Sequence, residues 1–187
     1  MDTVSTTSNG PAAFVRRFVG AAALDRSVYE EVEADRDATA QALAVVLIAS
    51  LGAGFGAQGF GGGGTAGVAF FSVLAMIAWA AWALVTYEVG VRILPEMQTR
   101  ADVGELLRTT GFATAPGVLF ALGALPGLAI PVFALILVWQ LVAMIVAVRQ
   151  ALDFSTDRRA LAVCGVGWAL SIAFAIVIGL VFGPRVS

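Results

Sequence analysis

The chain has 187 residues, of which 59% are hydrophobic and only 13% are charged, and its formal net charge at pH 7 is −2. Since soluble domains carry about a quarter charged residues, this composition and a mean hydropathy of +0.91 exclude a fully water-exposed surface and favour a protein embedded in lipid. The small net charge argues against a nucleic-acid partner, and the lack of histidine with a single cysteine, Cys164, excludes imidazole catalysis, histidine metal sites and intramolecular disulfides.

The N-terminal part is expected to precede the membrane-spanning part as two separate pieces. Residues 1–11 are polar, lack the basic start and apolar core of a secretory signal, and are expected to form a disordered tail. Residues 12–37 are expected to be helical and cytoplasmic. In AAFVRRFVGAAAL, Phe14 and Phe18 recur at helical spacing and the two arginines lie on another face. That pattern is typical of a helix lying in the membrane interface.

Five segments are expected to cross the membrane, because a spanning helix needs about 20 mainly apolar residues. They cover residues 38–56, 66–94, 110–125, 128–148 and 160–182. The sequence therefore predicts an all-α integral membrane protein, with a five-helix bundle over residues 38–182 and a short external tail over residues 183–187.

The arginines orient this bundle, since basic residues gather in cytoplasmic loops. They lie before the first span, between the second and third, and between the fourth and fifth: Arg16, Arg17, Arg26, Arg36, Arg92, Arg100, Arg108, Arg149, Arg158 and Arg159. Only Arg185 lies on the other side. We expect a cytoplasmic N-terminus and an external C-terminus in a plasma membrane. The exclusive use of arginine as basic residue and the abundance of Ala, Gly and Val indicate a GC-rich, prokaryotic genome.

No site for a cofactor, a metal ion or catalysis is predicted. The stretch GFGAQG, residues 54–59, matches G-x-G-x-x-G, but a dinucleotide site needs a strand before the motif and an acidic residue downstream. Here the motif follows a membrane helix, so we interpret it, with the glycines of residues 61–64, as a flexible loop. Paired carboxylates, a catalytic triad and a metal cluster are also missing from the sequence, and the protein is not expected to be an enzyme.

Three polar residues form a candidate intramembrane site, namely Glu88, Arg92 and Gln140. Glu88 and Arg92 lie four residues apart and share one helix face near the cytoplasmic end of the second span. They are either an interfacial anchor, with Arg92 reaching to the headgroups, or a pair lining a polar crevice. Gln140 lies near the middle of the fourth span, where its amide either bonds another helix or faces solvent or a ligand.

Local motifs predict how the helices begin, turn and pack. Gly52 and Gly56 form a GxxxG pair, which favours close backbone approach of a neighbouring helix. Asp102 and Glu105 have the spacing of a capping box. The tripeptide at residues 125–127, Leu-Pro-Gly, predicts a tight turn that makes the third and fourth spans a hairpin.

The stretch GFATAP begins at Gly111 and ends at Pro116, at the mouth of the third span. If the helix starts near Thr110, Pro116 lies beyond its first turn and should kink it, because proline lacks an N–H and crowds the carbonyl of Phe112. Gly111 then lets a neighbouring backbone pack against the bend.

Several stretches in this order resemble the Yip1 family of small membrane proteins. GFATAP fits its G-Y-x-x-x-P motif, with Phe112 in place of Tyr, and SVYEEVEADRDATAQALAVV, ELLRTTGFATAP and VWQLVAMIVAVRQALDFSTDRRAL look like its prokaryotic branch. The resemblance implies a cytoplasmic N-terminal region and five spans. The D-L-Y-G-P stretch of eukaryotic members is absent, so their link to Rab GTPases is not implied here.

Two functions from different classes stay open. The first is a non-enzymatic scaffold that organises membrane or binds a protein partner through cytoplasmic residues 12–37 and 95–109. The second is a small transporter or channel with a polar site near Glu88, Arg92 and Gln140. The lipid bilayer is the expected environment in both, and a homo-oligomer is compatible with either.

Overall fold

A computed structural model describes residues 10–61, 63–97 and 102–182, and every regular element in these ranges is a helix. The expectation of an all-helical protein is confirmed for this part of the chain. The expected tails over residues 1–11 and 183–187 lie largely or wholly outside it, as do Arg100 and Arg185.

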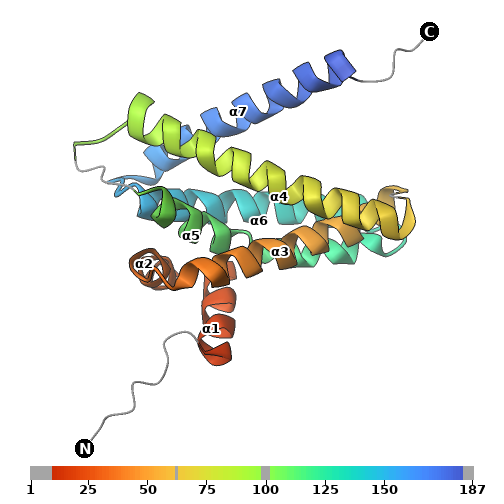
Figure 1. The fold of residues 1–187 in the computed structure, drawn as a ribbon, viewed down its shortest axis with the longest axis horizontal. Coiled ribbons are helices and arrows are strands. Elements are labelled where there is room, and N and C mark those ends of the chain that lie inside the picture. Colours follow the sequence, from red (N-terminus) through yellow and green to blue (C-terminus); the bar gives the residue numbers. More distant parts are fainter. Residues whose placement is uncertain (1–9, 62, 98–101, 183–187) are drawn as a thin grey trace, which may run out of the picture.

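Six of the ten elements are helices of more than ten residues, and α3, α4 and α6 all lie roughly along the long axis (Figure 1). Of these three, α3 and α4 pack closely against each other. The elements are α1 (Pro11–Ala22), α2 (Arg26–Ala34), α3 (Ala38–Gly56), the 3-10 helix η1 (Ala57–Phe60), α4 (Gly64–Glu88), the π-helical turn η2 (Val89–Ile93), α5 (Val103–Ala113), the 3-10 helix η3 (Ala115–Ala124), α6 (Ala129–Ala151) and α7 (Asp157–Phe182). The short α1 crosses the direction of α3, and α7 diverges from α4 toward its C-terminal end (Figure 1).

Among the residues that the structure describes, three helices are long and apolar enough to cross a membrane, at Ala38–Phe60, Gly64–Ile93 and Ala129–Ala151, with mean hydropathies of 1.8, 2.2 and 2.5. Their outer faces carry large exposed apolar side chains, such as Leu43 and Leu47 on α3. Such faces are costly in water and are matched by lipid tails. The chain is therefore a multi-pass membrane protein, and the count of five spans stays a prediction.

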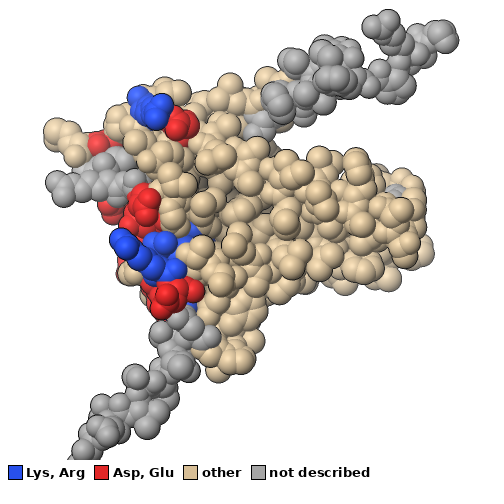
Figure 2. Space-filling view, in the orientation of Figure 1, with Lys and Arg blue, Asp and Glu red and all other residues tan. Residues whose placement is uncertain are grey.

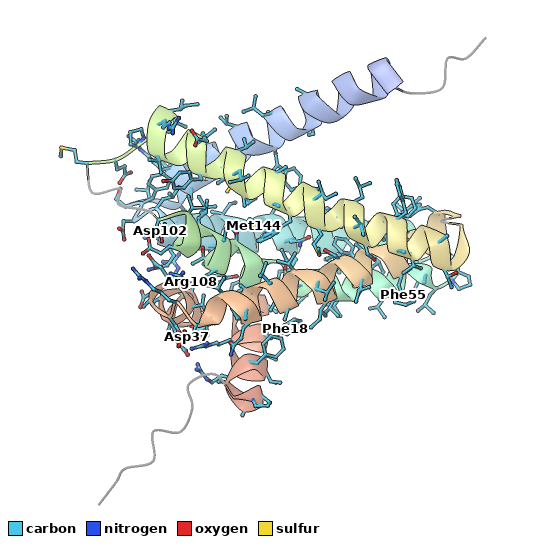
Figure 3. All side chains as sticks on the ribbon, in the orientation of Figure 1. Phe18, Asp37, Phe55, Asp102, Arg108 and Met144 are labelled. Carbon is cyan, nitrogen blue, oxygen red and sulfur yellow. The ribbon has the colours of Figure 1, made fainter. Side chains whose placement is uncertain are left out.

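Charged residues of the described chain fall only within residues 16–37, 88–108 and 149–159. These three stretches meet at one end of the molecule, which we call the charged end (Figure 2). Asp37, Asp102 and Arg108 lie there, and Phe55 lies at the opposite end (Figure 3). The most deeply buried large side chains, including Tyr29 and Leu106, also lie near the charged end. This end is packed as in a water-soluble protein, and the other end exposes apolar faces.

Two boundaries predicted from the sequence are confirmed. The Asp102 backbone N–H donates to Glu105 Oε2 at 2.9 Å, and the complete capping box opens α5. The Leu128 N–H donates to the Leu125 carbonyl at 3.1 Å, and Gly127 has a φ of 76°. A positive φ at the third position is what a type II turn requires, and it joins η3 to α6 as a hairpin.

The segment around GFATAP differs from the expected single kinked helix. The α-helix that carries this motif begins at Val103, not near Thr110, and ends at Ala113, where the 3-10 helix η3 takes over. The tightening starts with i to i+3 bonds, from the Thr114 N–H to the Gly111 carbonyl at 3.1 Å and from the Gly117 N–H to the Thr114 carbonyl at 2.7 Å. Pro116 lies in the first turn of η3, where its missing N–H costs little.

Close backbone packing joins α3 to η3, as the GxxxG pair predicted. A methyl group added to Gly52 would lie 2.8 Å from the Gly117 carbonyl oxygen, and one added to Gly56 would overlap the Phe120 carbonyl oxygen. Without side chains on these glycines, the two backbones approach closely enough for Cα–H···O contacts.

The interpretation of GFGAQG as a flexible loop is wrong. Residues up to Gly56 belong to α3, and residues 57–60 form η1. Gly54 faces α4, where an added methyl group would overlap the Ser72 hydroxyl oxygen. Tertiary packing therefore overrides the poor helix propensity of glycine. The turn begins only at Gly61, whose φ is 85°.

Candidate functional site

The structure contains a cavity of about 470 Å³ that is lined by residues of α3, α4, η3, α6 and α7. Its wall is mainly apolar and aromatic, with Trp79 and Trp82 from α4, Phe133 from α6 and Trp168 from α7. No charged side chain is among the described residues that line it. Its size and lining are those of a small-molecule pocket.

Gln140 lies on the wall of this cavity, half-buried, and the structure records no hydrogen bond for its amide among the residues it describes. The amide nitrogen lies against η3, because a methyl group added to Gly117 would be 3.3 Å from Nε2. Of the three residues of the candidate intramembrane site, Gln140 is therefore the one that lines this cavity.

Glu88 and Arg92 lie elsewhere, at the junction of α4 and η2. Glu88 Oε2 and Arg92 Nε are 3.0 Å apart, and the two side chains are 48% and 73% exposed. They pair with each other, as their spacing indicates, and neither belongs to the cavity wall. The structure does not bring Gln140 to this pair.

The GFATAP motif spans the junction of α5 and η3 and packs against α3. Phe112 is fully buried, and Pro116 is buried as well. A methyl group added to Gly111 would be 3.0 Å from Ala42 Cβ on α3, so this glycine permits close approach. The Thr114 hydroxyl donates to the Gly111 carbonyl at 2.7 Å and satisfies an acceptor at the α5 end.

At the charged end, Arg17 ties α1 to α2 and α3. Its side chain is only 1% exposed, with Nε donating to Glu31 Oε1 at 2.9 Å, Nη2 to Asp35 Oδ2 at 2.7 Å and Nη1 to Gln41 Oε1 at 3.0 Å. A guanidinium suits this position, because its planar fork can donate in three directions.

Arg108 fixes α2 to α5 through the end of the helix. Its Nε donates to the Val32 carbonyl at 3.0 Å and its Nη2 to the Glu33 carbonyl. These are among the last carbonyls of α2, which have no partner within the helix, and a cation near them is favoured by the helix dipole. Arg108 points from α5 toward α2 in Figure 3.

Side chains of α6 complete the attachment of the N-terminal helices. Trp139 Nε1 donates to the Ala22 carbonyl at the end of α1 at 2.8 Å, and Gln150 Nε2 donates to Glu33 Oε2 at 3.1 Å. The α1 and α2 helices are thus held by α5 and α6 as one unit with the spanning helices.

Two carboxylates of α2 have shifted pKa values. A hydrogen bond from Arg16 lowers the pKa of Glu31. Burial raises the pKa of Glu33, with a smaller opposing effect from its bond to Gln150. At neutral pH, Glu31 is therefore firmly ionised and holds Arg16 and Arg17.

The comparisons with known proteins identify the family. The model of the Yip1 domain matches residues 25–179, more than four-fifths of the chain. The chain belongs to the Yip1 family. No curated protein and no solved structure matches it.

The Yip1 domain of this protein begins after α1, since the match starts at Asp25. Yet α1 is not a loose extension, because Arg17, Trp139 and the partly buried Phe14 attach it to the domain. The sequence placed Arg17 on a polar face away from the apolar residues of this helix, and the structure instead buries it.

Some residues that line the cavity are not among the candidate site residues of the sequence analysis, namely Trp79, Trp82, Trp168 and Ser50. The three-residue spacing of Trp79 and Trp82 places both indoles on one face of α4, which was the available signal. Within the described residues, no group of three or more potential metal ligands is present.

Proposed function

We propose that this Yip1-family protein is a non-enzymatic scaffold of a prokaryotic plasma membrane, and that a protein partner docks at its charged end. The docking face comprises residues 12–37 and 95–109. The positive-inside rule supports placing this end in the cytoplasm. With the C-terminus outside, five spans result, and α5–η3 and α7 supply the two beyond the three long apolar helices.

The rigid attachment of α1 and α2 carries this proposal. Arg17 is almost fully buried, and Arg108 caps the C-terminal end of α2. These contacts hold in place the outer surface of α1 and α2, which faces water. Preorganisation of this kind lowers the entropic cost of binding a partner.

Photocrosslinking tests the proposed docking face. A photoreactive amino acid replaces Glu30 or Arg36, both exposed on this face, and the matched control replaces Leu47, which is exposed on the apolar face of α3. We expect the first two to crosslink to one discrete protein in cells and the control to crosslink to lipid. A second copy of the chain, as a homo-oligomer, would appear at twice the mass. Crosslinks to no protein from either position of a correctly inserted chain would refute docking.

The alternative, a small transporter or channel, has one observation in its favour. Gln140 lies on a cavity within the spanning helices, although Glu88 and Arg92 do not. Flux through liposomes containing the purified protein distinguishes the two functions. A scaffold passes no solute above background, whereas a flux that Gln140→Leu abolishes would favour the transporter.

A further inference from the structure

The cavity lies at the middle depth of the spanning helices. Gln140 is the twelfth of the 23 residues of α6, and Trp79 is near the centre of the segment Gly64–Ile93. An occupant at this depth enters from the lipid. It must be uncharged, because the described wall has no charged side chain that could pair with an ionic group.

Several polar groups around this cavity have no partner. The indole N–H groups of Trp79 and Trp82 are buried without a hydrogen bond. The side chain of Ser50 is 4% exposed and, like the Gln140 amide, has no recorded hydrogen bond among the described residues. Buried donors without acceptors are rare in native structures, so polar groups of this kind beside a cavity favour the binding of a polar ligand atom there.

The Gln140 amide and the Ser50 hydroxyl line the cavity and specify the polar chemistry of an occupant. Both groups can donate and accept hydrogen bonds. An acyl chain of a phospholipid offers no acceptor at this depth, because its ester oxygens lie at the interface. Water alone suits a cavity of this size with a mainly apolar wall poorly, because each water molecule needs two to four polar partners.

We infer that this cavity binds one neutral, lipid-soluble molecule that carries carbonyl oxygens, of the quinone class. Its apolar body lies against Trp79, Phe133 and Trp168, and a carbonyl oxygen accepts a hydrogen bond from the Gln140 amide. This site is independent of the proposed docking face, since it shares no residue with residues 12–37 or 95–109.

Tryptophan fluorescence offers a direct measurement, because three of the four tryptophans of the chain line the cavity and quinones quench indoles on contact. The full chain is placed in phosphatidylcholine nanodiscs and titrated with a decyl-substituted benzoquinone. We expect saturable quenching for the wild type. Gln140→Leu removes one hydrogen bond within the membrane and should weaken the apparent affinity roughly three- to thirtyfold.

Two variants on α4 distinguish a loss of binding caused by filling the cavity from a loss caused by misfolding. Ala75 lines the cavity, whereas Ala81 is exposed on the same helix and does not. We expect Ala75→Phe to abolish the saturable component and Ala81→Phe to keep it. This pair decides the matter even if Gln140→Leu does not fold, as judged by its circular dichroism and elution profile.

Two results would overturn the inference. Quenching that rises linearly with quinone and superimposes for all four proteins means that the probe only partitions into the bilayer. In nanodiscs whose acyl chains are brominated at mid-chain, strong quenching of the wild type that is reduced by Ala75→Phe and not by excess quinone would assign the cavity to a phospholipid tail.

Discussion

Arg16 and Arg17 follow each other in the sequence and bind the same carboxylate, yet their surroundings differ. The Arg16 side chain is 56% exposed, whereas that of Arg17 is nearly closed off and also reaches Asp35. In water-exposed pairs, the Coulomb attraction is largely offset by hydration and side-chain entropy. A buried guanidinium with several charged acceptors contributes more, because its removal leaves those acceptors unpaired.

Alanine substitution of each arginine should show how much more the buried side chain stabilises the fold than the exposed one. We expect Arg17→Ala to lower the free energy of unfolding by about 1.5–3 kcal/mol, and Arg16→Ala by no more than about 1 kcal/mol. The apparent midpoint of thermal unfolding in detergent, followed by circular dichroism, compares the two. Equal effects would contradict the role assigned to Arg17.

Acid should loosen the α1–α2 unit through Glu31. Because the Arg16 hydrogen bond lowers the pKa of Glu31 in the folded state, its stabilising contribution is complete above the ordinary value of 4.5 and is lost as pH falls through the lower folded value. Protease cleavage within α1, measured between about pH 6 and pH 3 with an acid-tolerant protease, should rise in that window. In Glu31→Gln the cleavage should already be raised at pH 6 and vary less with pH.

At the scale of elements, the packing of α3 against η3 depends on backbone contact and not on apolar side chains. Gly52 and Gly56 present a surface without Cβ atoms to the carbonyls of the 3-10 helix. Leucine-rich helices gain little by leaving lipid for one another, so close approach supplies the van der Waals contact. The 3-10 helix η3 begins within GFATAP, and several of its carbonyl groups lie against these glycines.

A pair of glycine substitutions tests this contact. In Gly56→Ala, the new methyl group overlaps the Phe120 carbonyl oxygen, and we expect a loss of about 1–3 kcal/mol. The matched control is Gly165→Ala on α7, where nothing lies within 4 Å of the new methyl group. The control should change stability by no more than about 0.5 kcal/mol. Thermal unfolding in the same detergent measures both, and an unaffected Gly56→Ala would contradict close packing.

For the whole molecule, the distribution of charge separates the two ends. At the charged end, Arg108 of α5 bonds the Val32 carbonyl of α2, and Arg26 of α2 pairs with Asp157 at the start of α7. Arg159 of α7 pairs with Glu96, which follows η2. The described turns at the opposite end carry no charged residue. Because basic residues gather on the cytoplasmic side of membrane proteins, we expect the charged end to lie inside the cell.

Cysteine labelling tests this orientation. The native Cys164 is fully buried and provides a silent background. We expect Leu128→Cys, exposed at the apolar end, to react with a membrane-impermeant maleimide on intact cells. Arg158→Cys, exposed at the charged end, should react only after permeabilisation. The reverse pattern would place the docking face outside the cell and remove the basis for a cytoplasmic partner.

The sequence by itself determined the membrane class, the helical architecture, the family, the α5 cap at Asp102 and the turn at Gly127. Hydropathy and charge are sums over a segment, and a cap or a tight turn involves residues within a few positions of each other. Each of these signals is therefore complete within a short stretch of chain.

Tertiary structure alone decided that Arg17 is buried, that GFGAQG continues a helix, that η3 winds as a 3-10 helix and that Gln140 faces a cavity. Each depends on which distant segments meet: α1 with α2 and α3, Gly54 with Ser72, or α4 with α6 and α7. The period of a helix tells which residues share a face, and only the packing of the other helices decides what that face meets.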